Sequence, residues 1–484
     1  MIIKGQNCDW EVVIGLEVHA QIKSESKLFS SSPVDHAAAP NSNVSFVDAA
    51  MPGMLPVLNQ KCVEYAVRTG LGLGGTINPI SIFDRKNYFY QDLPQGYQIS
   101  QFYQPIMNNG YLDIKDDQKR AKRIRIERLH LEQDAGKSLH DQGDDTLVDL
   151  NRCGVGLMEI VTAPELRSPT EAGDYLKKLR ALLRYLEVCD GDMEKGSMRC
   201  DANVSVRKIG ATEYGTRVEL KNLNSIRNVM YAIEIEARRQ VELIDGGKKS
   251  EIVQETRLFD PDKAITRSMR DKEEAADYRY FPDPDLMPLH LSHSYIENIK
   301  NNLPELPAQK FQRYVESFGL SEYDAEVLTE DLETSRYFEE VSSKVEPKIA
   351  TNWITTELFG RLNKGKLNIS QSPIGSGALA ELLFLVKNGT ISGKIAKDVF
   401  EKMFLSGESA TAIIEREGIK QVSDTSELDI LIKQVLGENP VELAAYKSGK
   451  DKLFGFFIGE IMKKSKGKAN PNVLNEILKK HLSE

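Results

Sequence analysis

Cysteine is scarce in this sequence, and its thiols do not form a recognisable framework. The 484 residues contain five cysteines, and no two of them have the C-x-x-C spacing of metal or redox motifs. An odd count without regular spacing fits reduced thiols, so we expect a cytoplasmic protein.

Long apolar runs and a secretion signal are also missing. The longest apolar runs, such as residues 453–459, are far shorter than the roughly 20 residues that cross a bilayer. The first twenty residues contain no basic segment followed by an apolar one, so we expect no signal peptide. We find no internal repeat, and a chain of this length predicts about three domains.

Positive charge is not in excess overall, but it gathers in one segment. The formal net charge is −9, which argues against a protein that is basic all over. Residues 447–484 contain nine lysines and four acidic residues, an excess of five positive charges. This split indicates a tail that meets a polyanion, although a solvated helix face would have the same composition. The lysines that lie closest together are Lys463, Lys464, Lys466 and Lys468.

One stretch in the N-terminal part carries chemistry on a strand pattern. Residues 12–22 alternate with period two, which predicts a β-strand with Glu17 and His19 on its polar face. Their spacing of about 7 Å suits two ligands of one cation or metal pair. A solvated strand face is the alternative interpretation.

Three further strand-like stretches, 123–137, 156–164 and 197–206, each contribute a carboxylate. In residues 123–137 the apolar side chains change from even-numbered to odd-numbered positions, which predicts a bulge near Glu127 or Arg128. Residues 156–164 form an apolar run with one acid, and such a charge is seldom buried unless it is paired or metal-bound. If the strands share a sheet, the side chains meet in one cavity as hard ligands for Mg²⁺ or Mn²⁺. The candidate ligands are Glu17, His19, Glu132, Glu159 and Asp201, with His130 as a possible addition.

A loop rich in aromatic and basic residues, 83–101, suits the stacking of bases or contact with a sugar-phosphate, although it could also be purely structural. Lys86 in this loop and Arg199 could neutralise phosphoryl oxygens. The residues alone therefore predict metal-assisted phosphoryl chemistry.

Several motifs resemble the B subunit of the aspartyl/glutamyl-tRNA amidotransferase, in order across residues 11–286. They include V-I-G-L-E-V-H-A-Q, F-D-R-K-N-Y-F-Y, L-H-L-E-Q-D-A-G-K, R-C-D-A-N-V-S-V and D-Y-R-Y-F-P-D-P-D-L. Residues 462–471 are similar to the family's C-terminal tRNA-binding domain. With the composition, the resemblance predicts an α+β protein. A mostly antiparallel sheet cradle in 1–295 takes ATP, Mg²⁺ and the acceptor end of the tRNA, a helical domain follows in 296–408, and a helical tail in 409–484 binds the body of the tRNA.

The resemblance implies that ATP phosphorylates the side-chain carboxylate of Glu on tRNA(Gln) or Asp on tRNA(Asn), and that ammonia then displaces phosphate. The chain shows no amidase segment rich in Gly and Ser, so ammonia should come from the amidase subunit of a heterotrimer, whose small third subunit bridges the other two. The family's metal-binding positions match the five ligands named above, so the implied cofactor is Mg²⁺. Lys86 matches the family's essential basic position. We predict Lys86, Glu132 and His19 as catalytic residues, and Lys86 and Arg199 as residues that bind ATP.

Two departures from the family pattern limit what is carried over. Many members have two cysteine pairs that bind zinc, but here those stretches read L-F-S-S-S and S-F-V-D, so we expect no zinc. The usual E-E-D reads Glu132-Gln133-Asp134, which leaves the role of the second acid open. A non-catalytic tRNA-binding scaffold and a two-metal nuclease or phosphatase remain alternatives, and either tRNA remains a candidate substrate.

Overall fold

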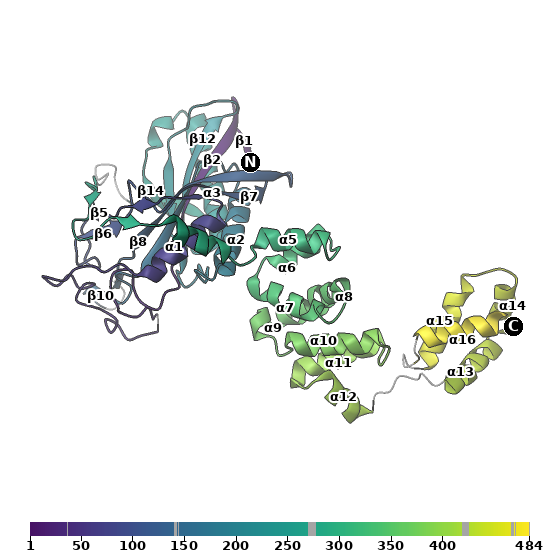
Figure 1. The fold of residues 1–484 in the computed structure, drawn as a ribbon. Helices are drawn as coiled ribbons and strands as arrows, with labels where there is room; N and C mark the ends of the chain where they lie inside the picture. Colours follow the sequence, from purple (N-terminus) through teal and green to yellow (C-terminus); the bar gives the residue numbers. More distant parts are fainter. Residues whose placement is uncertain are drawn as a thin grey trace. The chain divides into compact units, whose positions relative to one another are not determined.

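The computed structural model describes all residues except 36, 140–142, 144, 270–276, 419–424, 466–468, 470 and 484. The chain divides into two compact units, Met1–Pro307 and Ala308–Glu484 (Figure 1). Among the described residues, no helix is both long enough and apolar enough to cross a lipid bilayer.

A ten-stranded sheet forms the frame of the first unit. Its strand order is β15-β14-β13-β12-β2-β11-β8-β7-β3, and β1 pairs with β2. Only the β13–β14 pair is parallel within this described sheet, which confirms the predicted mostly antiparallel architecture. The strands of this sheet are β1 (Ile2–Lys4), β2 (Asp9–Gln21), β3 (Thr76–Ile77), β7 (Met107–Lys115), β8 (Ala121–Gln133), β11 (Gly156–Thr162), β12 (Met198–Lys208), β13 (Val218–Lys221), β14 (Thr256–Asp260) and β15 (Ile265–Ser268).

Shorter strands and several helices complete this unit. The strands β5 and β6 pair with each other, and β16 pairs with β5, in a separate small sheet. The short strands are β4 (Ile80–Ser81), β5 (Asp84–Asn87), β6 (Tyr97–Ser100), β9 (Lys137–Leu139), β10 (Leu147–Asp149), β16 (Phe281–Pro282) and β17 (Leu289–His290). The helices are α1 (Gln60–Gly72), α2 (Pro169–Tyr185), α3 (Ile226–Asp245) and α4 (His293–Asn301).

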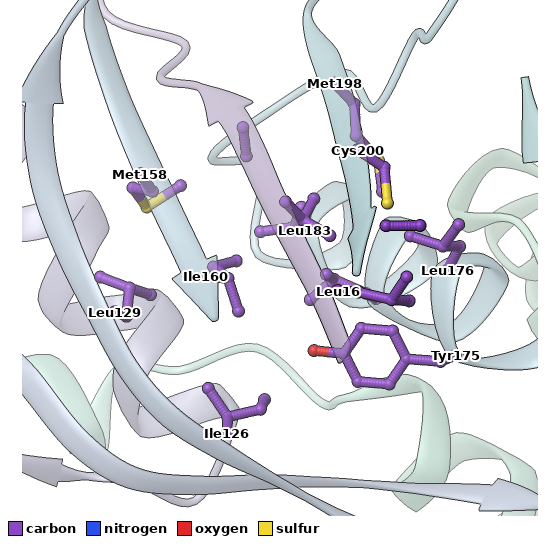
Figure 2. Close-up of a cluster of buried hydrophobic side chains, with 14 of the residues drawn as sticks. Leu16, Ile126, Leu129, Met158, Ile160, Tyr175, Leu176, Leu183, Met198 and Cys200 are labelled. Atoms are coloured by element: carbon purple, nitrogen blue, oxygen red, sulfur yellow. The ribbon is translucent and has the colours of Figure 1, made fainter. Parts of the chain in front are cut away.

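Alternation along β2 separates a buried face from a polar one. Leu16, Val18 and Ala20 are fully buried, whereas Glu17 and His19 between them are partly exposed. Figure 2 shows Leu16 among apolar side chains of neighbouring strands and of α2. Burying a large apolar side chain contributes roughly 1.5–3 kcal/mol, so this face fixes the register that presents the polar one.

A bulge in β8 lets apolar side chains on both sides of it point into the core. Val161 of β11 pairs with Arg128, but the next residue of β11 pairs with Ile126, so Glu127 is the extra residue. The predicted bulge is therefore confirmed. It turns the residues on both sides of the parity switch to the core, and all four are fully buried: Ile124, Ile126, Leu129 and Leu131.

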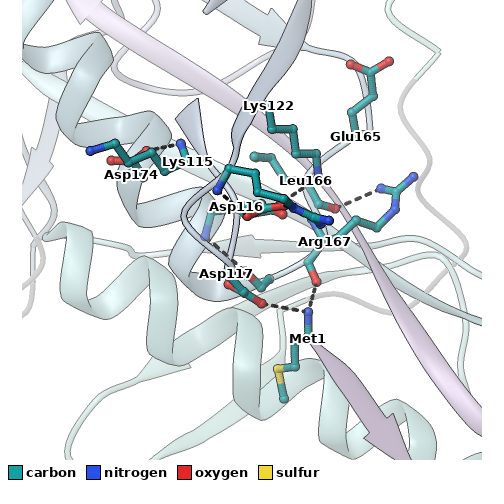
Figure 3. Close-up of polar contacts among 12 residues, drawn as sticks. Met1, Lys115, Asp116, Asp117, Lys122, Glu165, Leu166, Arg167 and Asp174 are labelled. Carbon is teal, nitrogen blue, oxygen red and sulfur yellow. Dashed lines mark hydrogen bonds and ion pairs between the residues drawn. The ribbon is translucent and has the colours of Figure 1, made fainter. Parts of the chain in front are cut away.

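The start of α2 is fastened to the β7–β8 turn and to the chain's amino group. Ser168 caps the helix by accepting from the Glu171 N–H. Its hydroxyl also donates to Asp117 over 2.6 Å. The Met1 amino group lies 3.3 Å from Asp117 and donates to the Arg167 carbonyl over 2.7 Å (Figure 3). These contacts hold α2 against the apolar face of the sheet.

The second unit is helical throughout its regular structure, as the sequence pattern predicts. Its buried apolar side chains form two clusters, one spanning Tyr314–Ile413 and one spanning Leu428–Leu482. Helix α4 belongs to the first unit, because Ile299 lies in that unit's core. The domain boundaries at residues 295 and 408 remain predictions. The helices are α5 (Pro307–Glu316), α6 (Glu322–Thr329), α7 (Leu332–Ser342), α8 (Pro347–Asn352), α9 (Phe359–Gly365), α10 (Ser376–Lys387), α11 (Gly393–Ser406), α12 (Ala410–Glu417), α13 (Thr425–Glu438), α14 (Pro440–Lys447), α15 (Leu453–Lys464) and α16 (Pro471–Ser483), with a π-helical turn (Trp353–Leu358) and a short 3₁₀ turn (Ile369–Gln371).

Candidate active site

Cross-strand register gathers polar side chains from four strands on one face of the sheet. Residues directly opposite each other on paired strands point to the same side. His19 of β2 lies opposite Glu159 of β11 and opposite Arg199 of β12. Glu159 in turn lies opposite His130 of β8, and Asp201 lies opposite Glu17. The side that the helices leave free is therefore lined with charged residues.

Apart from Arg199, these side chains line a cavity of about 790 Å³. The five predicted metal ligands and Lys86 are all among its lining residues. Side chains that the sequence did not single out as site residues also line it, and they come from β8, from β12 and β13, and from the segments around β14 and β16. These additional residues include Arg128, Asn203, Arg217, Glu219, Lys221, Thr256, Tyr278 and Tyr280.

The tightest group in the cavity consists of His19, Glu132 and Glu159. One potential ligand atom from each lies within 4.8 Å of the others. The His19 Nε2 is 3.5 Å from a Glu132 oxygen and 3.4 Å from a Glu159 oxygen. His130 contacts the same two carboxylates, with its Nε2 at 3.7 Å and 3.3 Å. We call His19, Glu132, Glu159 and His130 the ligand cluster.

Not every polar atom of the ligand cluster has a hydrogen-bond partner among the described residues. The Glu132 Oε2 and the His130 Nδ1 are buried and have no hydrogen-bond partner within the described part of the chain. A buried polar atom without a partner costs free energy unless a ligand or ion completes its bonding. Two carboxylates and an imidazole are donors that suit Mg²⁺ or Mn²⁺, so these residues fit the implied metal.

The electrostatics of the ligand cluster favour positive charge. Burial by itself lowers the pKa of a histidine, yet the carboxylates of Glu159 and Glu132 raise the pKa of His130 to about 9. The same carboxylates outweigh burial at His19 and raise its pKa as well. Although burial opposes it, contact with the two histidines holds the pKa of Glu159 well below its usual range. Protons or a cation can supply the charge that the carboxylates attract.

Glu17 and Asp201 lie in the same cavity but outside the ligand cluster. Glu17 accepts a hydrogen bond from Asn203 over 2.8 Å, and burial followed by the Glu159 charge raises its pKa. Asp201 accepts from Lys221 over 2.7 Å, and Lys221 is also 3.2 Å from Glu219. Burial lowers the pKa of a lysine, but these two carboxylates raise that of Lys221. The structure thus brings three predicted ligands into one group and leaves two beside it.

The two predicted phosphate-binding cations differ in their surroundings. The Lys86 Nζ is 4.9 Å from the ring centre of Tyr278, and no carboxylate of the described residues lies within ion-pair distance of it. Arg199 instead donates to Asp134 over 2.7 Å and is not among the described side chains that line the cavity. The predicted phosphate role of Arg199 therefore gains no support from its position and stays a prediction.

The Gln133 side chain, which stands where the family pattern has an acid, contributes to a loop contact. Its Nε2 donates to Gln95 over 2.8 Å, and the backbone carbonyl of Gln133 accepts from the Gln98 side chain over 2.8 Å. Both partners belong to the aromatic loop, so Gln133 ties that loop to β8.

A buried ion pair occupies the region where the family pattern has cysteines. The Lys27 side chain is 0% exposed and donates to Asp48 over 3.0 Å and to the Asn43 carbonyl over 2.7 Å. Ser30 also donates to Asp48, over 3.1 Å. These contacts need no metal. The expectation of no zinc stays a prediction.

The tail lysines are described only in part. Lys463 and Lys464 lie at the end of α15, where Lys463 pairs with Glu460 at 3.7 Å and Lys464 pairs with Glu438. Lys466 and Lys468 lie outside the described residues. Their role in binding RNA stays a prediction.

Comparison with known proteins extends over almost the whole chain. The family described as the GatB/GatE catalytic domain matches residues 12–297, and the GatB domain matches residues 336–482. The B subunit of the aspartyl/glutamyl-tRNA(Asn/Gln) amidotransferase of Rickettsia rickettsii (strain Iowa) is 59% identical over 482 residues, which cover 99% of each chain. The protein of the same name from Rickettsia bellii (strain RML369-C) is 58% identical over 481 residues, again 99% of each chain.

Proposed function

The chain belongs to the family of B subunits of the aspartyl/glutamyl-tRNA(Asn/Gln) amidotransferases, and we propose that its cavity activates the side-chain carboxylate of a misacylated tRNA with ATP. It is one component of a glutamine-dependent ligase that converts Glu-tRNA(Gln), Asp-tRNA(Asn) or both to the amidated forms. Its partners are the amidase subunit, which supplies ammonia, and the small third subunit of the same heterotrimer. We propose a cytoplasmic location, where these tRNAs serve translation.

The observation that carries the proposed site is one cavity that combines a cation-seeking ligand cluster with Lys86, a cation that has no carboxylate partner among the described residues. A carboxylate is a poor electrophile, and transfer of a phosphoryl group from ATP gives an acyl phosphate with a good leaving group. Mg²⁺ held by His19, Glu132 and Glu159 would neutralise charge on the phosphates when bound.

The chain's own residues have separate tasks in this proposal. Lys86 attracts the transferred phosphoryl oxygens, because it has no competing carboxylate among the described residues. His130 contacts both carboxylates and fixes their orientation toward the bound cation. Walls built from aromatic side chains exclude water from the acyl phosphate, which would otherwise hydrolyse before ammonia arrives.

The tail has a different proposed task, which is to hold the body of the tRNA. Its lysine excess supports contacts with phosphates, and such contacts depend on salt because they release counterions. We propose that Lys463, Lys464, Lys466 and Lys468 contribute to this binding.

A direct test uses the complex assembled with its partner subunits. We expect ADP and an acyl phosphate to form only when misacylated tRNA and ATP are both present, and amidated tRNA to follow when glutamine is added. Cleavage of tRNA without glutamine, or formation of amidated tRNA without ATP, would contradict the proposal. Glu17→Gln or His19→Ala should abolish the ATP-dependent step with tRNA affinity nearly unchanged.

A further inference from the structure

Six aromatic rings form a continuous array beside the ligand cluster. Phe102 stacks on Tyr280 with ring centres 4.1 Å apart and an interplanar angle of 13°. Tyr278 lies 6.0 Å from Tyr280, and Tyr103 lies 5.0 Å from Phe102. Tyr88 connects Tyr278, at 6.1 Å, to Tyr90, at 5.8 Å. The rings come from three segments, which follow β5, follow β6 and precede β16.

The array reaches from the cavity to solvent. Tyr90, Phe102, Tyr278 and Tyr280 line the cavity, whereas Tyr103 does not and is 64% exposed. Tyr280 lies near the ligand cluster. Burial raises its pKa, and the nearby charges of Glu159 and Glu132 add to this rise. The array therefore includes a ring beside the ligand cluster, Tyr280, and an exposed ring outside the cavity, Tyr103.

Hydrogen bonds to the backbone hold the segments that carry these rings. The Asp84 side chain is 0% exposed and accepts from the backbone N–H groups of Phe102, over 2.9 Å, and Tyr103, over 3.2 Å. The Asn87 side chain donates to the carbonyl of Tyr278 over 3.1 Å. Exposed aromatic surface contributes little to folding, so rings fixed in this way are arranged for a ligand.

We propose that this array is a stacking platform for the unpaired nucleotides at the 3′ end of the tRNA, with Tyr103 and Phe102 at its outer end. The inference rests on the proposed function, because the aminoacyl group is attached to the terminal nucleotide. If the carboxylate to be activated lies at the ligand cluster, the preceding nucleotides must pass the mouth of the cavity. Aromatic rings stack on any base, and Lys86 beside Tyr278 complements the phosphate backbone.

The extent of the array favours a strand over a single base. The adenine of ATP needs one or two rings, whereas three consecutive rings, Tyr280, Phe102 and Tyr103, lead from beside the ligand cluster to solvent, and three more continue the array on the other side of Tyr280. Tyr103 lies beyond the cavity lining and is the ring that best separates the two occupants.

The experiment measures binding of uncharged tRNA to the assembled complex, without ATP. Full-length tRNA is compared with tRNA that lacks its unpaired 3′ nucleotides. Tyr103→Leu and Phe102→Leu should each weaken binding of the full-length tRNA by about 5- to 150-fold. Neither should weaken binding of the shortened tRNA, because the stacked partner is gone. Tyr103→Phe should retain full affinity.

A matched control comes from the opposite side of the sheet. Tyr231 on α3 is 44% exposed, close to the 43% of Phe102, and α3 packs on the apolar face. Tyr231→Leu should leave both tRNAs bound as in the wild type.

Three outcomes would overturn the inference: equal weakening for both tRNAs, no weakening for either, or, in a separate turnover assay, a raised KM for ATP with tRNA affinity unchanged, which would assign the rings to adenine. Failure of the proposed function is separable, because it would appear as a wild-type complex that forms no acyl phosphate, whereas this binding assay involves no turnover.

Discussion

Two of the buried groups of charged side chains in the first unit, the Lys27–Asp48 pair and the ligand cluster, differ in whether their charges and hydrogen bonds are matched. In the Lys27–Asp48 pair, the ammonium contacts a carboxylate and a backbone carbonyl, and the carboxylate also accepts from Ser30. In the ligand cluster, two carboxylates share two histidines, and the Glu132 Oε2 and the His130 Nδ1 have no hydrogen-bond partner among the described residues. A matched group serves the fold, whereas an unmatched one is arranged for something that binds.

The largest expected effect concerns stability and falls on the matched pair. Lys27→Met leaves Asp48 buried without its counter-charge, which should lower the free energy of unfolding by about 3–5 kcal/mol. Denaturant unfolding measures the loss, and Lys61→Met, at a half-exposed lysine on α1, is the control that should stay within about 0.5 kcal/mol of wild type.

The paired variant Lys27→Met with Asp48→Leu should regain much of that stability, because no unpaired charge remains. If Lys27→Met alone unfolds at the wild-type denaturant concentration, the pair does not support the fold and the comparison fails.

The next effect concerns activity and falls on the unmatched group. Glu132→Gln removes a proposed ligand, so kcat/KM for ATP-dependent amidation should fall by about 10²-fold or more, equivalent to about 2.7 kcal/mol. Stability should not decrease, since the change removes one of several crowded carboxylates. Near-normal turnover, or unfolding as severe as in Lys27→Met, would assign Glu132 to the fold instead.

The strands that carry the ligand cluster could be predicted from the sequence, whereas the partners of the charges could not. Period-two alternation predicts β2 and puts Glu17 and His19 on one face, and the parity switch predicts the bulge at Glu127. These features depend on neighbours in the chain, so local pattern is sufficient.

The partners of the charges depend on contacts between distant segments and were not predictable. Arg199 reads as a free cation on a strand, but its partner Asp134 lies 65 residues away. The sequence pattern does not single out Lys27, yet segments around Asn43 and Leu150 cover it. Nothing in the local sequence specifies these contacts.

A smaller effect is expected for the tail, where lysines are exposed instead of buried. Lys463 is exposed on α15, and Lys463→Gln should reduce the slope of log affinity for tRNA against log salt by about 0.7–0.9, one phosphate contact. Binding measured from low to physiological salt gives the slope. An unchanged slope would mean that Lys463 belongs to a solvated helix face.

The smallest effect is the absence of a change. Because serine and aspartate stand where the family pattern has cysteines, the purified protein should contain no stoichiometric zinc, and a zinc-selective chelator should leave its unfolding curve unchanged. Elemental analysis that finds about one zinc per chain would contradict this.

The most direct test of the central claim, that the unmatched ligand cluster binds a divalent cation, is titration of the assembled complex with Mn²⁺ in the presence of ATP, followed by electron paramagnetic resonance of the free ion. The wild type should bind Mn²⁺ saturably, and Glu159→Gln should bind it at least about 10- to 100-fold more weakly. Glu165→Gln, which removes the same charge outside the cavity, should bind as the wild type does. Equal Mn²⁺ affinity in Glu159→Gln and the wild type would contradict the account.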